Sequence, residues 1–173
     1  AIHQAYIEAG SDIILTNTFG ANALKFHDDR YTVKDVVDAA VANVKAAVKK
    51  NADGRKIYIA LDVGPTGKLL KPLGDLDFEA AVGLYRDIAG IGVKEGVDLA
   101  LIETMSDSYE IKAAVLGVKE ACDLPIFVTM VLDEKGKLLT GGTVESMAAL
   151  LEGLRVDGIG VKCGLGPVKM KPV

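Results

Sequence analysis

Several polar side chains stand where apolar, strand-like runs of this chain end. Glu103 follows the run Leu99-Ala100-Leu101-Ile102, and Cys163 ends the run that starts at Gly158. A carboxylate at the tip of a buried strand is costly without a partner, so Glu103 is predicted to bind a cation or an ammonium group. A thiol beside a turn rich in Gly and Pro could serve as a metal ligand or as a nucleophile.

Three further runs end in polar residues, namely Asn17 with Thr18, Asp62, and Thr129. Backbone N–H groups after the first of these runs could hold a small anionic group such as a carboxylate, and an ordinary loop is the alternative. Asp62 could pair with an ammonium group, although the Gly64-Pro65-Thr66-Gly67 segment behind it is also typical of a plain turn.

Of the two cysteines, Cys163 is the stronger candidate for a functional residue. Cys122 lies at the end of an amphipathic helical pattern and fits a small buried hydrophobe. One cysteine does not make a catalytic zinc site, which usually takes three protein ligands. The two histidines, His3 and His27, do not lie at strand tips.

Lys162 precedes Cys163 and could form a Schiff base with a carbonyl substrate. Side chains alternate along a strand, so Lys162 and Cys163 should point to opposite faces. Ile159 and Val161 share the parity of Cys163 and suit a barrel interior. Lys162 is therefore predicted to point outward, past the helices.

The elements that would position these residues alternate along the chain. Continuous Ile/Val/Leu-rich runs predict parallel strands covered on both faces, and amphipathic stretches between them predict helices. The predicted strands are residues 12–16, 56–62, 98–103, 125–131 and 158–163, and the predicted helices are residues 33–50, 78–95, 108–121 and 144–153.

The composition narrows the class of protein. The 173 residues are 50% hydrophobic with a net charge of −4, which predicts a folded domain and gives no support for nucleic-acid or membrane-surface binding. No apolar run reaches the length of a membrane span and no secretory signal opens the chain. Two cysteines suit free thiols in a reducing cytoplasm, so a cytoplasmic location is expected.

Alternating strands and helices fit both a TIM barrel and an open doubly wound sheet. No Gly-x-Gly-x-x-Gly follows the first strand, which disfavours a dinucleotide fold. Units of about 36 residues would give eight units in roughly 290 residues, the usual barrel range. We therefore predict an α/β fold in which residues 1–173 are an incomplete (β/α)8 barrel, carrying strands two to six and lacking the first, seventh and eighth.

Taken together, the motifs resemble the homocysteine S-methyltransferase family, in particular the N-terminal homocysteine-binding module of its cobalamin-dependent branch. Four segments carry the resemblance over nearly the whole chain: residues 11–22, Gly64-Pro65-Thr66-Gly67, residues 101–107, and residues 160–167. The resemblance implies a zinc-dependent barrel in which three cysteines bind zinc. Cys163 matches the first of them, and the adjacent pair has no counterpart here. Lys162 stands where the family usually has Asn.

The resemblance implies methyl transfer to homocysteine, giving methionine. Cys163, through zinc, and Glu103 would be catalytic. Glu103 would bind the homocysteine amino group, the Thr18-Phe19-Gly20 backbone would lie near its carboxylate, and Asp62 is a further candidate in the same pocket. Methylcobalamin would be the donor, with cobalamin and folate modules of a parent enzyme as partners.

With a single thiolate, the chain by itself is expected to be inactive. Two alternatives stay open from the residues: a Schiff-base lyase that uses Lys162, and a non-catalytic barrel fragment that assembles with a partner.

Overall fold

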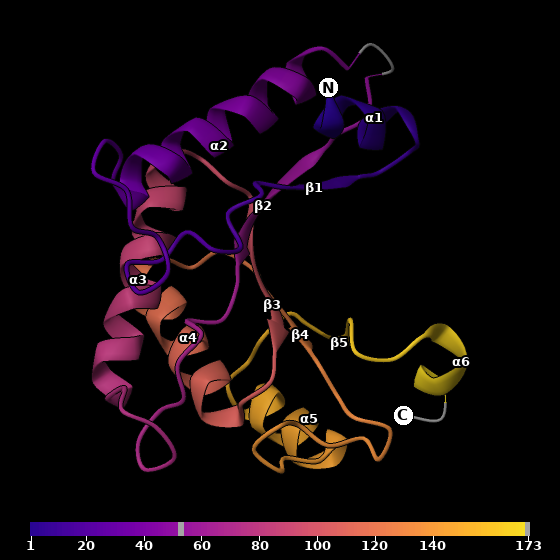
Figure 1. Cartoon of the computed structure of the whole chain (residues 1–173). Coiled ribbons are helices and arrows are strands. Elements are labelled where there is room, and N and C mark those ends of the chain that lie inside the picture. Colours follow the sequence, from indigo (N-terminus) through magenta and orange to yellow (C-terminus); the bar gives the residue numbers. More distant parts are fainter. Residues whose placement is uncertain (52–53, 172–173) are drawn as a thin grey trace.

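A five-stranded parallel sheet organises the computed structural model, which describes residues 1–51 and 54–171 (Figure 1). Its strands are β1 (Ile13–Leu15), β2 (Tyr58–Val63), β3 (Leu99–Met105), β4 (Ile126–Met130) and β5 (Gly158–Val161). Its helices are α1 (Ile2–Glu8), α2 (Val33–Lys49), α3 (Phe78–Lys94), α4 (Ser108–Ala121), α5 (Val144–Gly153) and α6 (Pro167–Met170). The predicted strands and the four long helices are confirmed to within a few residues at each end.

Three of the helices, α2, α4 and α5, begin at a residue whose side chain caps the helix. The Thr32 and Thr143 side chains each accept a hydrogen bond from the backbone of the first helical turn, and Asp35 and Ser146 return the bond. Asp107 accepts from two backbone N–H groups at the start of α4. Such caps satisfy donors that have no partner inside the helix.

The strands pair in chain order, β1-β2-β3-β4-β5, and every pair is parallel. Helices α2 to α5 follow the outside of the curved sheet, while α1 and α6 lie at its two ends (Figure 1). A doubly wound sheet would reverse its strand order and carry helices on both faces. Winding in one direction is consistent with a partial TIM-barrel-like domain. No helix within residues 1–51 and 54–171 is long and apolar enough to cross a membrane.

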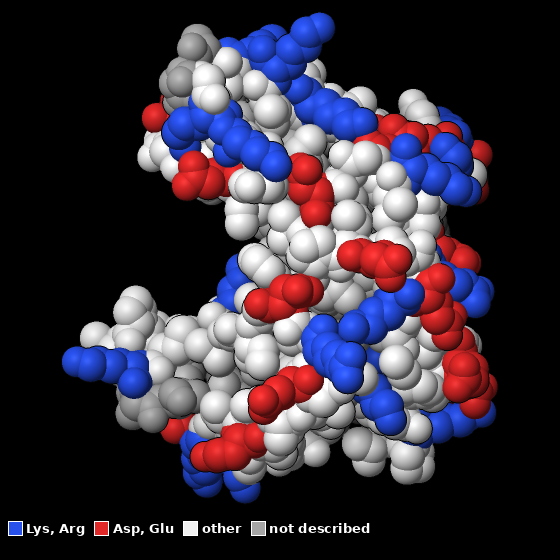
Figure 2. Space-filling model, turned by 180° about the vertical axis from the view of Figure 1, so that it is seen from behind, with Lys and Arg blue, Asp and Glu red and all other residues white. Residues whose placement is uncertain are grey.

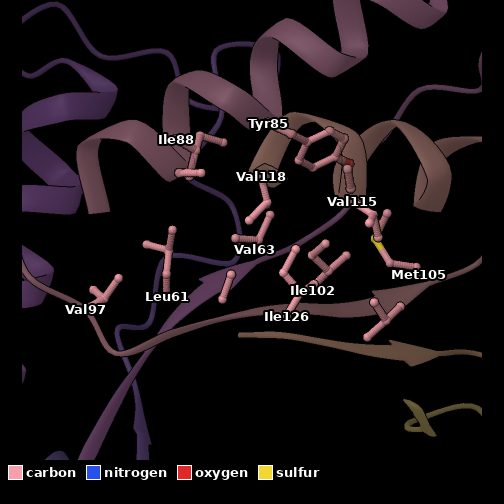
Figure 3. Close-up of a cluster of buried hydrophobic side chains, with 14 of the residues drawn as sticks. Leu61, Val63, Tyr85, Ile88, Val97, Ile102, Met105, Val115, Val118 and Ile126 are labelled. Carbon is pink, nitrogen blue, oxygen red and sulfur yellow. The ribbon is translucent and has the colours of Figure 1, made fainter. Parts of the chain in front are cut away.

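The largest buried core lies between the sheet and its helices (Figure 3). Leu61 projects from β2 toward α3, on the side of Ile88, whereas Ile102 of β3 lies on the side of the sheet that faces Val115 and Val118 of α4. Leu61, Ile102, Val115 and Val118 are all at most 1% exposed. We call this the helix-covered face and the opposite side the concave face. Because strand residues alternate, the neighbours of these core residues, including Asp62 and Glu103, point to the concave face.

The α3–α4 contact depends on a glycine. A Cβ placed on Gly117 would lie 2.5 Å from the Val82 carbonyl oxygen and 2.8 Å from the Arg86 amide nitrogen. Both atoms belong to the backbone of α3, so the two helices would have to separate. By contrast, a Cβ on Gly90 of α3 would meet no atom within 4 Å.

We predict that Gly117→Ala lowers the free energy of unfolding by about 1–3 kcal/mol, because overpacking outweighs the gain in helix propensity. The matched change Gly90→Ala should raise it by about 0.5–1 kcal/mol, since only helix propensity changes there. Urea unfolding followed by circular dichroism measures both. Equal effects of the two substitutions would contradict this account of the helix contact.

Candidate active site

A cavity of about 600 Å³ opens on the concave face, near the carboxyl ends of β1, β2 and β3. On this side the surface is deeply notched between its upper and lower lobes (Figure 2). Most of the lining is apolar, and the acidic side chains that line the cavity come from two neighbouring strands. The lining residues are Ile2, His3, Tyr6, Ser11, Ile13, Ile14, Leu15, Asn17, Phe19, Asp62 and Glu103.

Asp62 is a buried polar group of this cavity that is only partly satisfied. Its residue is 4% exposed and, among the described residues, its Oδ1 atom has no hydrogen-bond partner. Its backbone is fixed on both sides, because Asp62 N donates to Thr16 Oγ1 at 3.0 Å and Thr18 Oγ1 donates to Asp62 O at 2.7 Å. Burial, reinforced by the neighbouring Glu103 carboxylate, raises the pKa of Asp62 from 3.8 to about 7. Once ionised, a buried carboxylate of this kind favours a bound cation.

Glu103 lies on β3, next to Asp62 of the neighbouring strand β2. It is paired with Lys162, whose Nζ donates a hydrogen bond to Glu103 Oε2. Burial lowers the pKa of Lys162, but the Glu103 hydrogen bond and the nearby acidic groups outweigh it, so the pKa is raised overall. Lys162 is therefore held as a charged ammonium group.

The prediction that Lys162 points outward is wrong. The β4–β5 register pairs Val128 with Ile159 and Met130 with Val161, which places both β5 residues on the helix-covered face. The alternate β5 positions, beginning at Gly158, and then Lys162 share the concave face with Glu103. The predicted parity failed because the concave face of β5 is occupied by glycines, and the apolar residues on its other face were taken for the barrel interior.

Glycine has a steric reason at Gly158, where a Cβ would lie 2.9 Å from the Phe127 ring. A Cβ on Gly160 would make only an ordinary contact, 3.5 Å from the Thr129 side chain. The side chains of β4 thus cover the concave face of β5. Beyond them Lys162 reaches Glu103.

The loop after β1 forms one wall of the cavity. Phe19 lies against Gly64, where an added Cβ would be 2.4 Å from the Phe19 carbonyl oxygen. Lys25 Nζ lies 5.4 Å from the centre of the Phe19 ring. Thr18 is buried, whereas Gly20 is exposed and is not among the lining residues. The structure therefore brings Asp62, Glu103 and Phe19 around one space, with Thr18 supporting it from beneath.

Three strand-end residues hold left-handed backbone conformations that are unusual for their types. Asn17 and Thr104 have φ of 59° and Cys163 has φ of 61°. Such a conformation costs about 1–3 kcal/mol, most severely for a β-branched residue such as Thr104, and is concentrated at functional sites. The Thr104 amide donates a hydrogen bond to Thr129 Oγ1 at 3.2 Å. Thr129, one of the predicted strand-end residues, therefore supports the strained backbone at Thr104.

Cys163 is exposed and stands near the same edge of the sheet, with its Sγ 3.9 Å from Thr104 Oγ1. Within residues 1–51 and 54–171, no three His, Cys, Asp or Glu side chains come together as a metal site. The described residues therefore do not fit a complete catalytic zinc centre, and Cys163 could supply one ligand at most.

The sequence did not predict the contribution of α1. His3 and Tyr6 line the cavity although they are far from any strand end. No local signal marks them, because the position of α1 against β1 is a tertiary contact. The charge pair of Lys162 with Glu103 was missed for the same reason.

A second group of buried polar residues lies behind the loops and was also missed. Glu110 Oε1 accepts hydrogen bonds from Thr66 N at 2.7 Å and Tyr85 Oη at 2.9 Å. Burial, reinforced by Glu110, raises the pKa of Tyr85, so its hydroxyl stays a donor at neutral pH. Asp107 Oδ1 accepts from Thr140 Oγ1 at 2.9 Å. These bonds tie the loops after β2 and β4 to the start of α4.

The raised pKa of Asp62 predicts a pH dependence of stability. The folded chain keeps the Asp62 proton up to about pH 7, whereas the unfolded chain releases it near its ordinary value of 3.8. Stability should therefore fall as pH rises across this interval. Relative to the wild type, Asp62→Asn should gain about 2–4 kcal/mol of stability between pH 4 and pH 8.

Urea unfolding at a series of pH values checks this expectation. The control is Asp75→Asn, because the Asp75 side chain is 76% exposed and lies on the surface. A stability difference between Asp62→Asn and wild type that stays constant with pH would contradict the assignment.

Comparison with known proteins agrees with this geometry. The family model described as homocysteine S-methyltransferase matches residues 1–173. The chain is 32% identical over 179 residues to the methionine synthases of Mycobacterium leprae (strain TN) and Mycobacterium tuberculosis (strain ATCC 25618 / H37Rv). Each alignment covers 98% of this chain, which spans 15% of the length of each relative.

Among solved structures, the fold is similar to the metallated form of the homocysteine methyltransferase MmuM from Escherichia coli. The TM-score is 0.83 at 20% identity, covering 98% of this chain and 63% of that one. The apo form of the same protein gives a TM-score of 0.75 at 18% identity, covering 98% of this chain and 62% of that one. At these identities the likeness concerns the fold. With the family model matching throughout, the chain belongs to the homocysteine S-methyltransferase family.

Proposed function

We propose that this chain binds homocysteine in the cavity of the concave face, as part of a protein that methylates the homocysteine sulfur to give methionine. The observation that carries the proposal is the buried pair of Asp62 and Glu103 at the cavity wall, with Asp62 Oδ1 unpartnered. An α-ammonium group supplies the missing positive charge and the missing hydrogen bonds.

In this proposal Glu103 and Asp62 receive the homocysteine amino group. The backbone of Thr18-Phe19-Gly20 lies near its carboxylate, and Gly64 allows that loop to approach closely. Fixing both ends of the amino acid would orient its sulfur toward the rim near Cys163, where positioning lowers the barrier to reaction. The transfer forms a sulfur–carbon bond and breaks the bond from the methyl group to its donor, while the thiol proton leaves.

We extend the proposal to the rest of the protein. Strands β1 to β5 correspond to strands two to six of an eight-stranded barrel, and residues 1–173 form part of that domain. Family resemblance supports zinc at the sulfur end and methylcobalamin as donor. In this proposal Cys163 is one zinc ligand, and the other ligands and the cobalamin and folate modules would lie outside residues 1–173. Residues 1–173 alone would then bind homocysteine without transferring a methyl group.

A Schiff-base lyase that uses Lys162 is not favoured by the site. A lysine nucleophile needs a neutral amine, usually obtained through a lowered pKa. Here Glu103 and the neighbouring acidic groups raise the pKa of Lys162, which keeps the amine charged.

We predict that the purified 173-residue protein binds L-homocysteine in isothermal titration calorimetry and that Glu103→Gln weakens binding at least about tenfold. The loss of a charge-assisted hydrogen bond accounts for about 1.5–3 kcal/mol. Glu134→Gln is the matched control, because Glu134 pairs with Lys169 at an exposed position away from the cavity. Absence of homocysteine binding, or equal weakening in both variants, would overturn the proposed function.

A further inference from the structure

The ion pair of Lys162 with Glu103 joins two very different environments. The Glu103 side chain is 8% exposed and borders the cavity, whereas the Lys162 side chain is 41% exposed and is not among the cavity-lining residues. Lys162 thus approaches Glu103 from the β5 side, with its backbone anchored by a hydrogen bond from Lys162 N to Met130 O at 2.9 Å. The ammonium group neutralises Glu103 without filling the space in which a ligand would lie.

The charge balance of the cavity follows from this arrangement. Asp62 and Glu103 together carry two negative charges when ionised, and Lys162 carries one positive charge. One net negative charge remains on the Asp62–Glu103 pair, in which Asp62 Oδ1 is buried without a partner among the described residues. No lysine or arginine is among the described residues that line the cavity.

We propose that Lys162 is the residue that sets the charge selectivity of the cavity: by neutralising Glu103 it leaves one net negative charge on the Asp62–Glu103 pair, which receives the single ammonium group of a ligand. This inference rests on the proposed function and assigns a substrate property to a residue outside the cavity wall. A ligand with one ammonium group balances the site, whereas a ligand without one leaves a buried charge uncompensated.

The test compares ligands that differ only by the ammonium group. L-homocysteine and 4-mercaptobutanoate form the first pair, and L-2-aminobutanoate and butanoate form a second pair without the thiol. Their affinities are measured by calorimetry at pH 8 for wild type, Lys162→Met and Lys162→Arg. Methionine keeps much of the lysine stem without its charge, and arginine keeps the charge.

Lys162→Met adds a second uncompensated carboxylate, so the preference for the ammonium-bearing member of each pair should increase at least tenfold. Lys162→Arg should keep the wild-type preference. Lys169→Met is the matched control, because it removes the same charge from an exposed pair with Glu134. It should change the affinity for neither member of a ligand pair. Since Lys162 is partly exposed, Lys162→Met is expected to fold, and its urea unfolding curve verifies this.

A purely structural role would change the affinities of both members of a pair by the same factor, and that result would overturn the proposal. Failure of the proposed function has a different signature. In that case homocysteine binds no better than L-2-aminobutanoate in any variant, while Lys162→Met still widens the preference within each pair.

Discussion

The loops at the carboxyl ends of the strands depend on buried carboxylates at the start of α4. Glu110 is 3% exposed and Asp107 is 4% exposed. Among the described residues, neither has a lysine or arginine as a hydrogen-bond partner; backbone N–H groups and hydroxyls satisfy them instead. A buried carboxylate without its donors is expensive, so the chain segments that supply those donors are constrained to meet at α4.

This constraint extends to the cavity. Thr66 is bound by Glu110, and two residues before it Gly64 lies against Phe19 in the cavity wall. On the other side, Thr104 keeps its strained backbone with the help of Thr129. The loops that border the cavity are therefore positioned by contacts behind them, and the ligand-facing groups can remain incompletely satisfied. An unpartnered Asp62 oxygen is tolerable because hydrogen bonds to Thr16 and Thr18 hold the Asp62 backbone and because a proton can occupy the carboxylate.

The strands at the edges of the sheet affect which charged groups reach the cavity. In the described residues, β1 and β5 are the edge strands, and Ile13, Ile159 and Val161 are 42%, 47% and 36% exposed. The apolar side chains of β5 lie on the helix-covered face, so its concave face presents glycines and then Lys162. As a result, within the described part of the chain, the lysine whose ammonium group reaches Glu103 comes from the end of the edge strand β5, two strands away from β3. An edge strand and two inner strands of the same sheet thus share the electrostatics of one cavity.

Much of the architecture was determined by the sequence alone. The order of strands and helices, their approximate ends, the caps at Asp107 and Thr143, and the placement of Asp62 and Glu103 at neighbouring strand tips all follow from local patterns. Apolar periodicity and capping chemistry act over a few residues, and parallel strands bring their carboxyl ends to one edge. The same reasoning located Cys163 at that edge.

The tertiary structure decided how those tips face one another. The direction of the Lys162 side chain depends on the β4–β5 register and on β4 side chains that cover the glycines of β5. The alternation of apolar residues along β5 predicted the opposite direction. The part played by His3 and Tyr6, and the hydrogen bonds of Glu110, join residues far apart in the chain. Periodicity describes one segment at a time, whereas these contacts depend on the relative placement of several segments, which is fixed only when the core between sheet and helices has packed.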